Sequence, residues 1–204
     1  MNLYRELEFD SGVVFASVVL AAIYQTNNDL TRAAQLLDAS MAAAERTGNN
    51  LARSIALVNY GRLKFAEGDF ERAKQLCRES LRLREELSDK WGLVQCLVPL
   101  AAIAAIGGEP RRAAKILGAI DRLLDALNAA PPPIFRADHE PSLKAARCAL
   151  DEKSFAASFA EGRESSVEKI VEFALEDANN QPRDSETIDG REGGRFDANH
   201  RARQ

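Results

Sequence analysis

The chain has 204 residues, which is enough for one domain or one repeat array with a sizeable core. A hydrophobic share of 46% excludes wholesale disorder, and a net charge of −4 lacks the excess of lysine and arginine that binding to a nucleic-acid backbone requires. We therefore expect a folded protein that does not itself bind nucleic acid.

The first ten residues carry Glu6, Glu8 and Asp10 ahead of an apolar stretch over 13–24. A secretory signal would begin with basic residues, and a membrane span would need about 18 or more apolar residues. The sequence therefore favours a cytoplasmic protein with no membrane partner, and we expect residues 1–10 to be a lead-in to the first helix.

One pattern of residue types occurs three times, at residues 28–33, 68–73 and 108–113. Its arginines, Arg32, Arg72 and Arg112, lie 40 residues apart without a slip. A period of this length is typical of helical-pair solenoids, whose units must stack because none can bury a core alone. Alanine is abundant and β-branched clusters are scarce, so we expect an all-α fold.

Turn and cap signals divide the repeat into helix pairs. Asp29 is a good N-cap, residues 48–50 supply a stop, and Pro110 is tolerable at a first helical position. The expected helices cover 11–26 with 29–47, 51–67 with 69–87, and 90–106 with 110–127. Short turns between them imply antiparallel neighbours. Each unit, 11–47, 51–87 and 90–127, is then one hairpin.

The residues after 127 change in character. The prolines at 131–133 predict a stiff extended break, and helices over 135–150 and 152–161 would form a fourth unit, 135–162. Ser165 and Glu168 form a capping box for a last helix with one apolar stripe, which suits an end cap over 165–177. Residues 178–204 are polar and aperiodic, and we expect them to be disordered.

Residues that lie 40 apart occupy equivalent positions in the three units, and we call each such set a column. The columns predict the core. Two columns hold only small residues, as a close crossing of two helices requires: Ala21, Gly61 and Ala101, and Ala33, Ala73 and Ala113. Three columns hold large residues that would fill the core between units: Leu36, Leu76 and Ile116, then Ile23, Leu63 and Ile103, then Leu20, Tyr60 and Leu100. The arginine column is more simply structural, its stems covering the core while the heads meet water or a carboxylate.

Catalytic interpretations fail because the polar residues do not converge. Asp138, His139 and Glu140 would point about 100° apart on a helix, and neither HExxH nor GxSxG is present. The three cysteines, Cys77, Cys96 and Cys148, are widely spaced and favour buried reduced thiols. We expect no enzyme, no cofactor and no metal. Trp91 is better interpreted as an anchor against the preceding helix than as a ligand platform.

Gly61 within a first helix and Ala73 early in a second helix resemble the tetratricopeptide repeat, in a variant with longer helices. Over residues 61–175 the chain also resembles the MalT-like C-terminal helical region of bacterial LuxR-type transcriptional regulators and predicted ATPases. The distinctive marks are residues 89–92, 117–119, 131–136 and 159–163. The resemblance implies a right-handed α-solenoid that senses a partner or inducer. Because GxxxxGK[ST] and a helix-turn-helix are absent, neither ATP hydrolysis nor DNA binding is carried over.

In tetratricopeptide arrays the first helix of each pair lines a concave groove, so the resemblance implies a partner-binding face. It comprises Phe15, Val18, Val19, Ala22 and Gln25 from the first unit, Ile55, Val58, Asn59, Arg62 and Phe65 from the second, and Gln95, Val98, Pro99 and Ala102 from the third. This face is mostly apolar, which suits a helix, an apolar peptide, a small effector or another copy of the chain. Pro99 would free the carbonyl of Gln95 and bend its helix.

Several interpretations stay open at this stage. The C-terminal helices or further repeats could equally cover the predicted face. The first function is a protein-interaction or effector-sensing module, the second is a structural module that forms a homodimer through its apolar first helix, and the third is a small hydrolase or metal protein within a helical scaffold. The sequence alone names no ligand.

Overall fold

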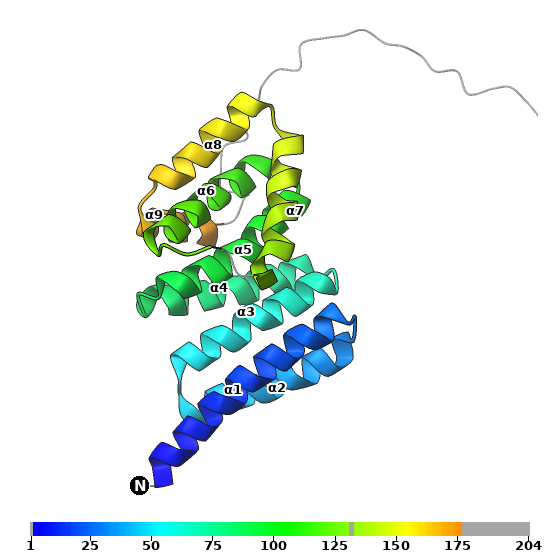
Figure 1. Ribbon diagram of the computed structural model, residues 1–204, viewed down its shortest axis with the longest axis vertical. Helices are drawn as coiled ribbons and strands as arrows, with labels where there is room; N and C mark the ends of the chain where they lie inside the picture. The colour runs from blue at the N-terminus through cyan, green and yellow to red at the C-terminus, as the bar shows by residue number, and fades with distance from the viewer. Residues whose placement is uncertain (1, 131–132, 177–204) are drawn as a thin grey trace, which may run out of the picture.

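The computed structural model describes the backbone of residues 2–130 and 133–176, and the side chains of residues 12–130 and 139–176. The described residues form helices only, packed as antiparallel pairs in a stack (Figure 1), so the predicted α-solenoid is confirmed. The helices are α1 (Asn2–Thr26), α2 (Leu30–Thr47), α3 (Asn50–Ala66), α4 (Phe70–Glu86), α5 (Lys90–Ile106), α6 (Pro110–Ala126), α7 (Pro133–Ala149), α8 (Glu152–Glu164) and α9 (Val167–Leu175).

The turns repeat with the same 40-residue period as the sequence. Left-handed backbone occurs within each pair at Asn28, Gly68 and Gly108, and between pairs at Gly48, Ser88 and Asn128. Glycine and asparagine adopt this conformation at the least cost, which is why they end helices here. The next residue closes each helix by donating its amide to a carbonyl five residues back, at 2.9 Å for Asp29, Asp69 and Glu109 alike.

The helix starts also match between units. The carboxylates of Asp29 and Asp69 each accept the amide of the arginine three residues later, at 3.1 Å in both cases. Arg32, Arg72 and Arg112 are each the third residue of α2, α4 and α6. Matching positions of these arginines confirm the register from which the fold was predicted.

Small residues lie where the two helices of each pair cross. The predicted small columns are buried throughout: Ala21, Ala33, Gly61, Ala73, Ala101 and Ala113. A Cβ on Gly61 would lie 2.6 Å from the Cys77 sulfur of α4, closer than real contacts allow. The approach of the two helices therefore depends on having no side chain at this position.

The first helix differs from the prediction at both its start and its surface. α1 begins at Asn2, so residues 2–10 of the expected lead-in are helical instead, in a stretch without proline or glycine that is rich in good helix formers. Leu20 and Ile23 were predicted in the core, yet they are 46% and 51% exposed. No helix pair precedes α1 in the described part of the chain, so their outer side is open.

The C-terminal helices do not form the expected fourth hairpin. α8 lies along α6 and scarcely touches α7, which packs against α5 and α6 (Figure 1). α9 folds back against α4 and α6. Its N-cap is Ser166, which accepts the Lys169 amide, rather than the predicted Ser165, whose hydroxyl instead donates to the Glu161 carbonyl at 2.8 Å. The tail expected to be disordered lies outside the described residues.

Candidate interaction surface

The third-unit part of the predicted binding face is covered. Val98, Pro99 and Ala102 are buried, because α7 packs on α5 and brings Leu143 into the same core cluster as Val98. These three residues were expected to line an open groove and do not, whereas Gln95 stays half-buried at the side of the helix. α5 continues through Pro99 as one helix from Lys90 to Ile106.

The second-unit part is mixed. Val58 is only 2% exposed and belongs to the core, so it is not a surface residue. Asn59 donates its side-chain amide to the Ile55 carbonyl at 2.8 Å, and the Phe65 and Phe70 rings form a T-shaped pair with their centroids 5.4 Å apart. Ile55, Asn59, Arg62 and Phe65 are all half-buried. The side chains in this part of the face are therefore only partly accessible to a partner.

The first-unit part is open. Phe15 and Val19 are 67% and 45% exposed, and they lie four residues apart, on the same side of α1 as Ile23. With Leu20 they make a continuous apolar patch, which we call the α1 strip (Phe15, Val19, Leu20 and Ile23). Val18, Ala22 and Gln25 are half-buried beside it. Large exposed apolar side chains gathered on one side of a helix are typical of a binding surface.

Sequence reasoning missed Leu20 and Ile23 as surface residues. The 40-residue columns group Ile23 with Leu63 and Leu20 with Leu100 as large apolar residues of the core, and Leu63 and Leu100 are indeed buried. The columns compare residue types only, and they do not show whether a neighbouring unit covers a given position, so no signal in the pattern distinguishes Leu20 and Ile23 from their buried counterparts.

The first two arginines of the column contact neighbouring residues in the same turn or helix. Arg32 lies 3.3 Å from the Asp29 carboxylate and Arg72 donates to Gln75 at 3.2 Å, both at the surface. Arg112 is buried and bonds to the C-terminal end of α9, with its guanidinium 4.6 Å from the centre of the Phe173 ring. One position of the repeat therefore serves a different contact in the third unit.

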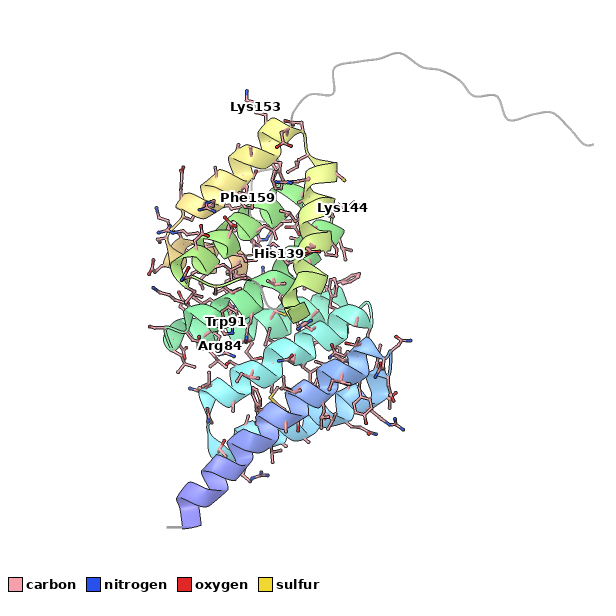
Figure 2. All side chains as sticks on the ribbon, in the orientation of Figure 1. Arg84, Trp91, His139, Lys144, Lys153 and Phe159 are labelled. Atoms are coloured by element: carbon pink, nitrogen blue, oxygen red, sulfur yellow. The ribbon has the colours of Figure 1, made fainter. Side chains whose placement is uncertain are left out.

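Residues around the start of α5 lock the α4–α5 turn. The Asp89 carboxylate caps α5 by accepting the Gly92 amide at 2.9 Å and also pairs with buried Arg84. Figure 2 labels Arg84 and Trp91 at this end of the α4–α5 pair. A Cβ on Gly92 would lie 2.3 Å from the Arg84 side chain, which explains the glycine. Trp91 is half-buried and packs against the main core cluster.

The reactive side chains are dispersed. Among the residues described, no group of three or more His, Cys, Asp or Glu side chains is placed to hold a metal ion. Burial lowers the pKa of half-buried His139, partly opposed by the charge of Glu140, while Asp138 lies outside the described side chains. Burial raises the pKa of Cys96 to about 12, so this thiol stays protonated at neutral pH.

No helix within residues 2–130 and 133–176 is both long and apolar enough to cross a membrane. Comparison with curated proteins gave no match, and neither did comparison with solved structures. A family model described as tetratricopeptide repeat matches residues 15–86, from α1 to the end of α4. This region contains two of the stacked pairs and the α1 strip. Residues 15–86 are therefore a tetratricopeptide repeat region, of a class that generally binds proteins or peptides and is typically non-catalytic.

Proposed function

We propose that the chain is a non-catalytic interaction module of the cytoplasm that binds an apolar peptide or helix along α1 and α3. The observation that carries the proposal is the α1 strip, whose four large apolar side chains are 45% to 67% exposed. An amphipathic helix presents a stripe of matching width, and burying such a surface is the main source of affinity in helix-in-groove complexes. Asn59 and Arg62 on α3 are half-buried and would supply polar contacts to a ligand that also reaches α3.

Selection of peptides on the full chain tests this proposal. A random-peptide library panned against the immobilised protein should yield amphipathic sequences, and Phe15→Asp with Val19→Asp should weaken their binding at least about tenfold, because each change puts a charge into an apolar contact. Ile106→Asp is the matched control, since Ile106 is 58% exposed at the far end of α5. Equal binding by both variants would show that the wrong surface was chosen.

The same strip supports a second function, a homodimer formed through α1. A two-fold contact uses the same patch on both copies, and a helix with a continuous apolar stripe is suited to meet itself. Light scattering on the purified chain separates the two functions. A dimer mass that Phe15→Asp converts to a monomer mass would favour the dimer, and a monomer mass for the unmodified chain would remove it.

We further propose that the module comes from, or is related to, a bacterial transcriptional regulator of the LuxR type and senses a partner or effector there. Support comes from the resemblance over residues 61–175, including Gly118 and Gly162, which meet at a helix crossing. The adjoining reading frames test this origin. A nucleotide-binding or DNA-binding segment in the same or the next polypeptide is expected, and a neighbourhood with neither would contradict it.

A further inference from the structure

Consecutive second helices are splayed apart. The first helices α1, α3, α5 and α7 contact one another in succession, whereas α2 and α4, and likewise α4 and α6, barely meet. A gap therefore opens between each two second helices, with a first helix as its floor. We call these gaps the α2–α4 wedge, with α3 as floor, and the α4–α6 wedge, with α5 as floor.

The α4–α6 wedge is filled by the chain's own helix α9. Ala174 of α9 is 2% exposed and lies against a lining that includes Leu100, Ile103 and Ile116. The space that remains is a cavity of about 10 Å³, room for about one water molecule. A short amphipathic helix with a small residue on its inner face thus fits a wedge of this array.

Two arginines hold the C-terminal end of α9. Arg78 of α4 donates from Nε to the Ala174 carbonyl at 3.0 Å, and also donates to the Glu176 carbonyl. Arg112 of α6 donates to the carbonyls of Phe173 at 2.6 Å and Glu176 at 2.7 Å. The last carbonyls of a helix lack partners within it and carry partial negative charge, so two guanidinium groups complement them.

The α2–α4 wedge is lined by residues at the corresponding repeat positions, 40 residues earlier in the chain, but this wedge is open. Its floor and one wall are Tyr60, Lys64, Arg72 and Leu76, the counterparts of Leu100, Ala104, Arg112 and Ile116. Asp38, Met41, Ala42 and Glu45 of α2 form the other wall. The cavity measures about 400 Å³, and in the described part of the chain no helix lies in it as α9 lies in its neighbour.

One difference between the wedges sets the chemistry of an occupant. Asp38 stands in the register position of Arg78, where its carboxylate accepts the Tyr60 hydroxyl at 3.1 Å. Glu45 on the same wall also carries a negative charge, but its counterpart in the filled wedge is Glu85, so the difference between the wedges lies at Asp38. Negative charge there repels helix carbonyls and attracts a cation. α9 has no basic residue in its last turn, so the open wedge disfavours α9 itself.

We propose that the α2–α4 wedge binds an amphipathic helix of another protein that carries lysine or arginine in its last turn. The cation meets Asp38 and Glu45, and Arg72 takes the last carbonyls as Arg112 does for α9. Arg72 is exposed and bonds to Gln75 of its own helix at 3.2 Å, a surface contact that exchanges at little cost. This surface lies between second helices, so the proposal does not depend on binding along α1.

Two labelled peptides test the proposal on the full chain. Both carry the sequence 166–176 with Glu172→Lys joined to Glu168 by a lactam bridge, because so short a helix is marginal in water. The first keeps Leu175 and Glu176, and the second has lysine at both positions. Fluorescence anisotropy should show the lysine peptide binding about fivefold or more tightly than the first. Equal affinities would overturn the proposal.

Variants of the full chain locate the binding. Ala42→Trp fills the wedge and should abolish binding of the lysine peptide, whereas Ala157→Trp on the exposed side of α8 is the matched control and should not change it. Asp38→Arg recreates the Arg78 position and should reverse the preference between the peptides. Because Asp38 is exposed, we expect Asp38→Arg to fold, and this variant is sufficient for the test if Ala42→Trp does not fold. An unreversed preference would contradict the assignment.

If something other than a partner helix occupies the α2–α4 wedge, the experiments give different results, and each of these would overturn the proposal. A dimer mass that falls to a monomer mass in Ala42→Trp would assign the wedge to a second copy of the chain. Faster amide exchange over residues 177–204 in the same variant would assign it to the chain's own C-terminal segment. Phe15→Asp should leave binding of the lysine peptide unchanged, which separates failure of this proposal from failure of binding along α1.

Discussion

Gly118 of α6 and Gly162 of α8 meet where the two helices cross. A Cβ on Gly118 would lie 2.0 Å from the Phe159 carbonyl oxygen, and one on Gly162 would lie 1.9 Å from the Lys115 carbonyl oxygen. Figure 2 shows Phe159 on α8 beside α6. Ion pairs flank the crossing, with Lys115 2.5 Å from Glu161 and Arg163 2.7 Å from Asp125. The crossing is therefore close enough for backbone to touch backbone.

We predict that Gly118→Ala and Gly162→Ala each destabilise the protein by about 1–3 kcal/mol, since neither backbone can give way as a side chain would. Urea unfolding followed by circular dichroism measures the change. Gly12→Ala is the control, because nothing lies within 4 Å of a Cβ there, and in a helix interior it should be neutral or stabilise by about 0.5–1 kcal/mol. Equal effects at Gly12 and Gly118 would disprove the close crossing.

Arg112→Met should release α9, because the carbonyls of Phe173 and Glu176 lose a charged donor while partly buried. A lost bond of this kind costs about 1–3 kcal/mol, so amide protection in α9 should fall roughly tenfold or more in hydrogen exchange. Arg72→Met is the matched control from the same repeat position. Unchanged α9 protection in the Arg112 variant would show that the arginine does not hold the helix.

The thiols should react unequally. Cys96 is buried, donates to Ser80 at 3.2 Å and has its pKa raised to about 12, Cys77 is also buried, and Cys148 is exposed. Iodoacetamide at pH 8 should therefore modify Cys148 in the native protein and reach Cys77 and Cys96 only after denaturation. Mass spectrometry of tryptic peptides gives the answer. Rapid native labelling of Cys96 would contradict its burial in the core.

Stability should fall as the pH falls below that of neutral solution, in part through His139. Burial lowers the pKa of His139 in the folded state, so below about pH 6.5 the unfolded chain takes up a proton that the folded chain resists. The loss should level off below the folded pKa. Urea unfolding at several pH values should show a smaller loss between pH 7.5 and 5.5 in His139→Gln than in the unmodified protein. An equal loss of unfolding free energy in the two proteins would rule out a contribution from His139.

The repeat could be predicted from sequence because its determinants are local. Asn28, Gly68 and Gly108 each set a left-handed turn, and Asp29 and Asp69 cap the helices that follow them. Such signals depend on a few neighbouring residues, so a period read from the sequence carries over directly to the backbone.

The C-terminal packing could not be predicted in the same way, because its contacts join residues far apart in the chain. The burial of Val98 depends on α7, and the buried state of Arg112 depends on α9, more than 50 residues later. Gly118 and Gly162 did carry a signal. Each is an isolated glycine within an otherwise helical pattern, which usually has a packing reason.

The candidate surface was predicted in part. Phe15 and Val19 were expected at the surface and are exposed, whereas Val58 and Val98 were expected there and are buried. The repeat alignment assigns faces as though every unit had neighbours on both sides. It therefore fails where α7 covers α5 and where α1 is left open. It also fails at Val58, which packs in the same buried cluster as Val94 and Val98 of α5, so this position of α3 faces the core rather than a groove.

The central claim is that this chain binds an apolar partner along α1 and α3. Chemical-shift mapping of the labelled full chain with a selected amphipathic peptide tests it most directly. We predict that the perturbed amides cluster around Phe15, Val19 and Ile23 on α1 and around Asn59 and Phe65 on α3. Perturbations confined to α6, α8 and α9, with α1 unchanged, would contradict the account.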